Sequence, residues 1–293
     1  LRCRQSPDRN IDRELFVANG LLDRLGGAYP TSISAEDSIP KAAIKALEFV
    51  VKYFDVTVHG QENVPDGGAL LVGNHSHFGI DSLAFFPSVL DATGRVPRGM
   101  ALRSLFDVPG LNWLMHQLGA VEGTREACID LLQHGEMVVT YPGGAKDSIK
   151  GKDDRYTLKW GAREGFSDVA LRSQAPVVPF AGIGPDEVFP VLNNRGLVSA
   201  PFLGDASYKV PLLIPIARRV PFHFHIGEPI DPPELAGLDD AQICEARHEF
   251  AETARRALES LIERGLEQRR RRQREERREE AGTLRGAIKA LLS

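Results

Sequence analysis

Short apolar runs alternate with stretches of helical periodicity between residues 55 and 181, and this alternation constrains the fold more than any other feature. A strand, a helix and a further strand in succession form a parallel pair, because the helix carries the chain back to the end from which it started. The sequence therefore predicts an α/β protein with a largely parallel central sheet covered by helices. The expected strands are 55–59, 69–73, 99–102, 136–140, 176–181 and, late in the chain or at the sheet edge, 219–226; the expected helices are 81–90, 104–118, 125–134 and 161–173.

Changes in composition divide the 293 residues into three regions. Residues 1–39 are expected to form an N-terminal helical extension, with a helix at 11–25 followed by a break rich in Gly, Pro and Ser. Residues 40–239 form the main domain, and residues 240–293 a C-terminal helix with a charged tail. Seven arginines and five glutamates lie between residues 267 and 280, a net charge of only +2, which is typical of a solvated helix with ion pairs four residues apart.

Composition and charge narrow the class of protein. With 42% hydrophobic residues, the chain can bury one large core or two modest ones. A net charge of −4 gives no overall attraction to nucleic acid or to an anionic membrane, so any affinity for either has to come from a local patch. No stretch approaches the roughly 18 to 20 uncharged apolar residues of a spanning helix, and the start has no apolar signal core. We expect no nucleic-acid partner, and we expect the protein to lie at the cytoplasmic face of a membrane.

The segment from Pro40 to Phe54 is amphipathic and has two interpretations. Proline suits the first turn of a helix, and apolar residues recur behind it at helical spacing with lysines between them. One interpretation is a helix that packs on the main domain. The other is a helix that lies on a lipid surface.

A histidine and an aspartate stand where the buried run 69–73 passes into a helical pattern. His75 follows the strand, so it is expected at the carboxyl edge of the sheet, where α/β proteins bind ligands. A neutral imidazole accepts a proton from a hydroxyl near neutral pH, and Asp81 at the start of the helix is placed to orient it. The alternatives are a structural loop histidine, an aspartate that only caps the helix, and His77 as a rival base.

A second candidate element is the turn Tyr141-Pro142-Gly143-Gly144, which follows the apolar run 136–140. Two glycines let the backbone approach a ligand, and successive N–H groups bind a phosphate or a developing oxyanion. The alternative is an ordinary tight turn. Six cations follow this turn, and they suit the binding of a polyphosphate carrier or of anionic headgroups. The alternative is an ordinary solvated loop, because aspartates lie among them. The cations are Lys146, Lys150, Lys152, Arg155, Lys159 and Arg163.

Two His-x-His pairs raise the question of a metal, since alternate residues of a strand share one face. The pairs are His75/His77 and His223/His225, and neither is followed by the further ligand spacing of a known zinc motif. The sequence contains no G-x-S-x-G, no P-loop and no G-x-G-x-x-G. We therefore expect no metal site, no cofactor and neither a serine-hydrolase nor a nucleotide-binding site.

The strand-end residues resemble the first block of the glycerolipid acyltransferase superfamily, the PlsC-like lysophospholipid acyltransferases. That block is His-x4-Asp, often preceded by Asn, and here Asn74 and His75 precede Asp81 with one extra residue in the spacing. The second block, Gly-x-Ile-Phe-x-x-Arg, is similar to residues 119–125, with Arg125 at the arginine position. Residues 122–125 also spell the Glu-Gly-Thr-Arg of the third block, but their order in the chain places them in the second.

The third block, Phe-Pro-Glu-Gly-Thr-Arg, is better matched by residues 141–146, where Gly143 replaces the glutamate and Lys146 the arginine. The fourth, an apolar strand with prolines, resembles residues 175–180. The longer first spacing and the Pro-Gly-Gly turn look like the monoacylglycerol/diacylglycerol acyltransferase-like branch. The loss of the glutamate argues against assigning a phosphate acceptor of the lysophosphatidic-acid type.

The resemblance implies an acyltransferase that moves a fatty acyl group from acyl-CoA or acyl carrier protein, as co-substrate, to a hydroxyl of a glycerolipid or lysophospholipid. It implies a glycerolipid acyltransferase-like fold and peripheral attachment to a membrane, through the helix 40–54, the basic segment 146–163, or both. The alternatives are a metal-dependent hydrolase that uses His75 and His77, and a non-catalytic protein that binds lipid or acyl-CoA. The implied catalytic residues are His75 and Asp81, and the implied substrate-binding residues are Asn74, His77, Arg125, Tyr141, Pro142, Gly143, Gly144 and Lys146.

Overall fold

A computed structural model describes residues 41–101, 107, 115, 119–199 and 209–291. Seven of its strands form one sheet in the order β1-β9-β6-β2-β5-β3-β4. Every neighbouring pair is parallel except β6 and β9. The predicted α/β class is confirmed. The strands are β1 Thr57–His59, β2 Ala69–Gly73, β3 Pro97–Ala101, β4 Val121–Glu122, β5 Met137–Thr140, β6 Val177–Ile183 and β9 His223–Ile226.

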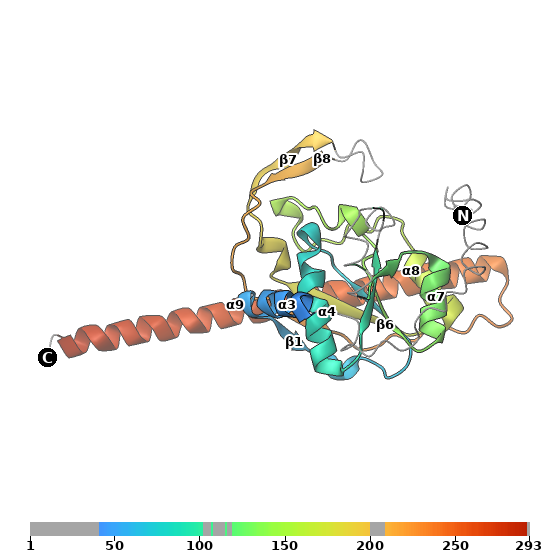
Figure 1. Ribbon diagram of the computed structural model, residues 1–293, viewed down its shortest axis with the longest axis horizontal. Helices are drawn as coiled ribbons and strands as arrows, with labels where there is room; N and C mark the ends of the chain where they lie inside the picture. Colours follow the sequence, from blue (N-terminus) through green and yellow to red (C-terminus); the bar gives the residue numbers. More distant parts are fainter. Residues whose placement is uncertain (1–40, 102–106, 108–114, 116–118, 200–208, 292–293) are drawn as a thin grey trace.

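Helices cover both faces of the sheet (Figure 1). Alternate residues of β2 point to opposite faces, so Leu70 and Val72 pack beneath one helix layer and Leu71 beneath the other. All five residues of β2 are buried, which explains its continuous apolar sequence. One layer is α3 Lys41–Tyr53 and α4 Ile80–Thr93; the other is α7 Arg125–Gln133, α8 Gly165–Ser173 and α9 Asp240–Leu291. Short 3-10 helices are η2 Gln61–Asn63, η3 His77–Gly79, η4 Gly144–Lys146, η5 Lys152–Asp154 and η6 Pro185–Glu187.

The C-terminal helix α9 has two parts with different surroundings. Its first part contributes Phe250, Ala254 and Leu258 to the core beneath the sheet, so this part is integral to the main domain. Its second part projects away from the sheet (Figure 1). Exposed ion pairs lie along that part, such as the 3.0 Å contact from Arg271 Nε to Glu267 Oε1, as the charge pattern predicted.

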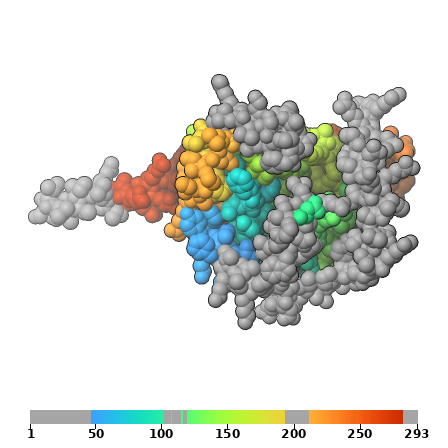
Figure 2. All heavy atoms as spheres, turned by 45° about the horizontal axis from the view of Figure 1, so that its top comes forward, coloured from blue at the N-terminus to red at the C-terminus, as the bar shows by residue number. Residues whose placement is uncertain are grey.

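An antiparallel pair of strands, β7 Val191–Ser199 and β8 Lys209–Leu213, was not predicted. The residues after β8 lie beside α3 and α4 on one face of the molecule (Figure 2). The strand expected late in the chain or at the sheet edge, β9, comes last in the described chain and lies between β1 and β6. The helix expected at 161–173 begins at Gly165.

The predicted helices at 11–25 and 104–118 fall outside the described residues, apart from single positions in the second. In the part of the chain that the structure describes, none of the helices has the length and apolar composition to cross a membrane.

Candidate functional site

The site lies at one edge of the sheet, where the loops after three neighbouring parallel strands meet. The strands β6, β2 and β5 are adjacent and point the same way, so their carboxyl ends lie side by side. His75 comes from the loop after β2, Tyr141 from the loop after β5, and Asp186 from the loop after β6.

His75 and Asp81 are in contact. The distance from His75 Nδ1 to Asp81 Oδ2 is 2.9 Å, and the second carboxylate oxygen accepts a hydrogen bond from Ser76 Oγ at 3.0 Å. The Asp81 side chain is 2% exposed and the His75 side chain 17%. Since the carboxylate accepts a hydrogen bond from Nδ1–H, the neutral ring carries its lone pair on Nε2. No residue in the described ranges forms a hydrogen bond with Nε2.

Two left-handed residues make this contact possible. Phe78 has φ 57° and Gly79 φ 71°, and together they turn the chain back so that the first turn of α4 faces the end of β2. Asp81 is the second residue of α4, and its carboxylate therefore reaches His75 across six positions of sequence. This turn accommodates the spacing that is one residue longer than His-x4-Asp.

Tyr141 supports the imidazole from one side. Its ring stacks on His75 with ring centroids 4.1 Å apart and an angle of 16° between the planes. Its hydroxyl accepts a hydrogen bond from Ser82 Oγ at 3.0 Å. Burial, with a further contribution from the Asp81 carboxylate, holds the pKa of the Tyr141 phenol well above 10, so the ring stays neutral. Sequence analysis placed Tyr141 at the site, and the structure gives it partners inside the protein.

The electrostatics of the pair suit proton transfer. Burial lowers the pKa of His75, but the charge and hydrogen bond of Asp81, with help from Asp147, outweigh that effect. The net result is a pKa above 6.5, so the ring is a stronger base than a free histidine. A partly exposed imidazole with a free Nε2 and a fixed tautomer can act as a general base.

Asn74 extends the pairing of β2 with β6. Its Nδ2 donates to Gly182 O at 3.1 Å and its Oδ1 accepts from Gly182 N at 2.8 Å. The side chain therefore replaces one step of the backbone ladder beyond Gly73. Because Asn74 is 2% exposed, it fixes the position of the His75 loop from inside.

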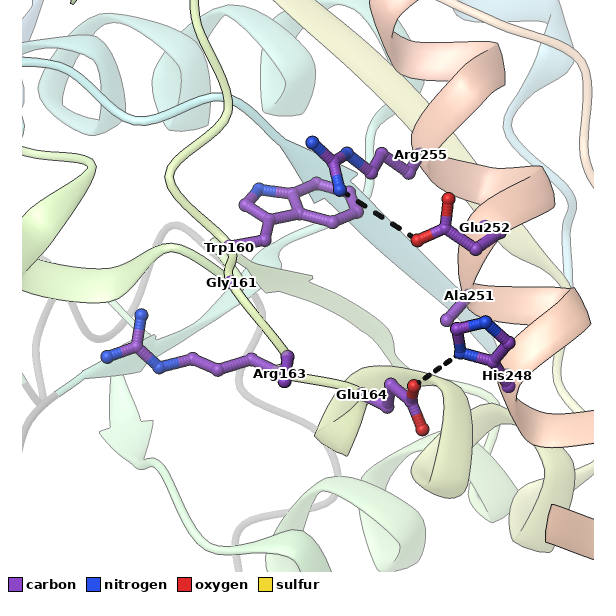
Figure 3. Close-up of a pocket in the computed structure, with 9 residues that line it drawn as sticks. Trp160, Gly161, Arg163, Glu164, His248, Ala251, Glu252 and Arg255 are labelled. Atoms are coloured by element: carbon purple, nitrogen blue, oxygen red, sulfur yellow. Dashed lines mark hydrogen bonds and ion pairs between the residues drawn. The ribbon is translucent and has the colours of Figure 1, made fainter. Parts of the chain in front are cut away.

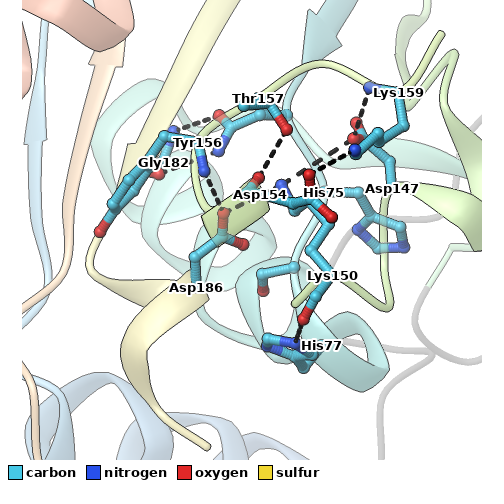
Figure 4. Close-up of polar contacts among 12 residues, drawn as sticks. His75, His77, Asp147, Lys150, Asp154, Tyr156, Thr157, Lys159, Gly182 and Asp186 are labelled. Carbon is cyan, nitrogen blue, oxygen red and sulfur yellow. Dashed lines mark hydrogen bonds and ion pairs between the residues drawn. The ribbon is translucent and has the colours of Figure 1, made fainter. Parts of the chain in front are cut away.

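A buried ionic cluster lies behind this loop (Figure 4). His77 contacts the Lys150 carbonyl through Nε2 at 2.8 Å, and Lys150 Nζ lies 2.9 Å from Asp186 Oδ2 and 3.9 Å from Asp147 Oδ1. Burial lowers the pKa of His77, whereas the two carboxylates raise that of Lys150 against burial. Sequence analysis counted Lys150 among cations for anionic ligands; its side chain is fully buried and serves the fold instead. Only the tertiary structure reveals Asp186, 36 positions away, as its partner.

The glycine turn after β5 is shaped by contacts within the protein. The N–H of Gly144 donates to Tyr141 O at 2.8 Å, so it is engaged inside the turn, and Gly143 O accepts from Arg163 Nη1 at 3.0 Å. A Cβ on Gly143 would lie 2.3 Å from the Cβ of Asp147, which explains why glycine stands at this position. Pro142 and Lys146 complete the turn, at the same sheet edge as His75.

Arg125 is at this edge but farther from His75. It is the first residue of α7, which Thr124 caps by accepting from Ala127 N at 3.2 Å. In the sheet, β4 is three strands away from β2, or about 14 Å at the usual strand spacing. The Arg125 side chain is 49% exposed, and Nη1 lies 3.8 Å from Asp168.

The histidine pairs do not gather metal ligands. Within the described ranges, no group of three or more His, Cys, Asp or Glu side chains is arranged to hold a metal ion. His75 and His77 have different partners, and His59 stacks on His225 with ring centroids 4.7 Å apart.

A depression of about 240 Å³, which His75 does not line, lies between residues 160–164 and α9 (Figure 3). Its charged lining is largely paired internally: His248 Nδ1 lies 2.7 Å from Glu164, and Arg255 lies 3.8 Å from Glu252. We assign it no chemistry.

Comparison with known proteins gives a family match, several similar relatives and a solved structure. A family model described as Acyltransferase matches residues 55–182. A protein of Mus musculus named "DGAT1/2-independent enzyme synthesizing storage lipids" is 34% identical over 122 residues, which are 42% of this chain and 37% of that protein. Its namesake in Homo sapiens is 29% identical over 218 residues, 71% of this chain and 60% of that protein.

An uncharacterised protein of Mycobacterium tuberculosis is 34% identical over 237 residues, 76% of this chain and 66% of that protein. The matches thus span between 37% and 66% of these relatives' own lengths. Among solved structures, the 1-acyl-sn-glycerophosphate (LPA) acyltransferase PlsC of Thermotoga maritima matches with a TM-score of 0.42 and 21% identity, over 75% of this chain and 82% of that chain.

Proposed function

We propose, from the match of residues 55–182 to the family model described as Acyltransferase, that the chain moves a fatty acyl group from an acyl thioester to a hydroxyl of a glycerolipid or lysophospholipid. His75 acts as the general base and Asp81 orients it. One observation carries the proposal: the 2.9 Å contact between these side chains leaves Nε2 as the basic nitrogen, at the carboxyl edge of the central strand β2.

The chemistry needs no covalent enzyme intermediate. The acceptor hydroxyl attacks the thioester carbonyl while His75 Nε2 takes its proton, and Asp81 stabilises the imidazolium that forms. The tetrahedral intermediate then collapses, the C–S bond breaks, and the imidazolium returns the proton to the departing thiolate. The products are an ester and a free thiol. The thiol carrier is CoA or acyl carrier protein.

The residues around the pair divide into two groups in this proposal. Asn74, His77 and Tyr141 position the loop and the imidazole, since their polar atoms bind inside the protein. Lys146, in the turn after β5, provides positive charge near the reacting carbonyl. Arg125 follows β4, three strands from β2, and suits a remote anionic part of a long substrate, such as a phosphate of CoA.

A variant of the base tests the proposal. We expect His75→Ala to lower acceptor-dependent thiol release by about 10²- to 10⁴-fold, the usual contribution of a general base. His134→Ala is the matched control, because that imidazole is 59% exposed and lies at the end of α7, away from the site. Near-normal turnover by His75→Ala, with its folding verified by circular dichroism, would refute the assignment.

The acceptor requires a separate experiment. Labelled acyl-CoA is incubated with a mixed panel of lysophospholipids, monoacylglycerol and diacylglycerol, and the lipids formed are identified by mass spectrometry. Label in one lipid class identifies the acceptor. Acyl-CoA binding without any labelled lipid product, for this panel and with acyl carrier protein as an alternative donor, would favour a non-catalytic binding protein.

A further inference from the structure

The exposed large apolar side chains of the described residues belong to one part of the fold. They come from α3, from α4 and the loop before it, and from β7, β8 and the residues that follow. The opposite helix layer of α7, α8 and α9 contributes none of them. The six side chains, with exposed fractions from 39% to 68%, are Phe49, Phe78, Leu83, Leu192, Leu212 and Ile216, and we call them the apolar face.

Contacts join the α3 side of this face to the residues after β8. Phe49 stacks on Tyr53 with ring centroids 5.8 Å apart, and the Tyr53 hydroxyl donates to Ala217 O at 3.3 Å, next to Ile216. The space-filling view shows α3, α4 and the residues after β8 side by side (Figure 2). These elements therefore present one surface although their sequences are far apart.

Phe78 connects this surface with the candidate catalytic loop. Its ring meets Phe189 edge-on at 5.4 Å, and Phe189 lies just before β7. Phe78 is three residues after His75, is 64% exposed, and has a left-handed backbone that side chains with a Cβ rarely adopt. Strained backbone and an exposed aromatic ring are both unfavourable, and such features persist where a function requires them.

The charge around the apolar face suits an anionic partner. Arg218 and Arg219 are exposed, and the hydrogen bonds of their guanidinium groups go to backbone carbonyl oxygens. Within residues 47–55 and 214–219, these arginines and Lys52 make three cations against Glu48 and Asp55, a net charge of +1 in a chain of net charge −4. Apolar side chains beside an excess of cations are typical of surfaces that bind anionic membranes.

We propose that the apolar face docks on an anionic lipid bilayer, with Phe49, Phe78, Leu212 and Ile216 entering the headgroup region. His75 then faces the membrane side of the protein, and the acceptor lipid reaches Nε2 without leaving the bilayer surface. The inference rests on the proposed function in so far as the acceptor is a lipid. Of the basic segment 146–163, the other expected attachment site, Lys150 is buried and does not contribute.

Vesicle sedimentation tests the proposal with the full chain and no acyl donor. The vesicles are phosphatidylcholine with or without phosphatidylglycerol. We expect Phe49→Ser with Ile216→Ser to weaken partitioning about tenfold for each side chain removed from the interface. The same pair changed to leucine keeps the apolar surface and is expected to bind like the wild type.

Matched arginines test the electrostatic part. Arg218→Ser is expected to weaken binding to phosphatidylglycerol vesicles about fivefold, whereas Arg256→Ser on the exposed side of α9 is expected to have no effect. Unchanged partitioning of the double serine variant, or no vesicle binding by the wild type, would overturn the proposal. A change in sedimenting mass without vesicle binding would show that the face joins two copies of the chain, which also overturns it.

Activity distinguishes this inference from the proposed function. The double serine variant is expected to lose transfer to vesicle-borne acceptor in parallel with its partitioning, while transfer to a monodisperse short-chain acceptor stays at the wild-type rate. Vesicle binding without transfer to any acceptor would refute the enzyme and leave the docking face standing. Transfer by both proteins at equal rates on vesicles would refute the docking face and leave the enzyme.

Discussion

Replacing Asp81 by asparagine isolates the electrostatic part of the proposed mechanism, because the two side chains have nearly the same shape. In the structure Asp81 Oδ2 lies 2.9 Å from His75 Nδ1, and Oδ1 accepts from Ser76 Oγ. Asparagine can keep the Ser76 contact through its own oxygen. Its amide NH₂ then faces Nδ1, which favours the tautomer with the proton on Nε2 and removes the basic lone pair.

The expected loss follows from what the carboxylate contributes. A hydrogen bond to a charged group contributes about 1.5–3 kcal/mol, and stabilisation of the developing imidazolium disappears with the charge. We therefore expect Asp81→Asn to lower kcat by about 10²- to 10⁴-fold, with a much smaller effect on KM. Asp130→Asn is the matched control, since that carboxylate is 53% exposed and lies on α7.

The pH profile provides an independent readout. A base works only when neutral, so in the wild type the rate falls as the pH drops through the pKa of His75, which lies above 6.5. In Asp81→Asn the raising effect of the carboxylate is lost and burial, which lowers the pKa of His75, remains. The acid limb of log(kcat/KM) is therefore expected below 6.5 in the variant. An unchanged acid limb together with a near wild-type rate would refute the role of Asp81.

Three further changes test the framework around the site. Lys150→Met leaves Asp147 and Asp186 buried without a cation, and we expect a loss of about 3–5 kcal/mol in the free energy of unfolding, measured by urea denaturation; an unchanged midpoint would contradict it. Gly143→Ala places a Cβ 2.3 Å from the Cβ of Asp147, so we expect the free energy of unfolding, measured by urea denaturation, to fall by about 1–3 kcal/mol. An unchanged free energy of unfolding would show that the turn shifts without cost and would contradict this prediction. Arg269→Gln removes the bidentate ion pair with Glu187, with contacts of 2.6 and 2.9 Å, that joins α9 to the loop after β6. We expect the free energy of unfolding to fall by about 1 kcal/mol and the Tm, measured by calorimetry, to fall with it. An equal Tm would show that the pair does not contribute to stability.

Sequence reasoning succeeded where the signal was local. The apolar run of β2 and the helical pattern after it predicted that His75 and Asp81 stand at one junction, and the structure places them in contact. The charge alternation after residue 266 likewise predicted the exposed end of α9. The role of Tyr141 was less accessible, because ring stacking on His75 depends on the distance between two neighbouring strands.

Contacts between distant segments could not be predicted in the same way. Lys150 stands in a basic stretch that suggested a solvated or ligand-binding loop, yet Asp186 comes from another strand end and pairs with it in the interior. The position of β9 between β1 and β6 depends on how the chain returns to the sheet, and strand order leaves no periodic mark in the sequence.

By itself the sequence determined the α/β class and the junction that holds the candidate base, because hydrophobic periodicity and short spacings are local properties of the chain. Only the tertiary structure decided which charges are buried in pairs and which apolar side chains gather on one face. Burial and electrostatic pairing depend on separations in space, and those separations exist only after strands and helices that are distant in sequence have packed together.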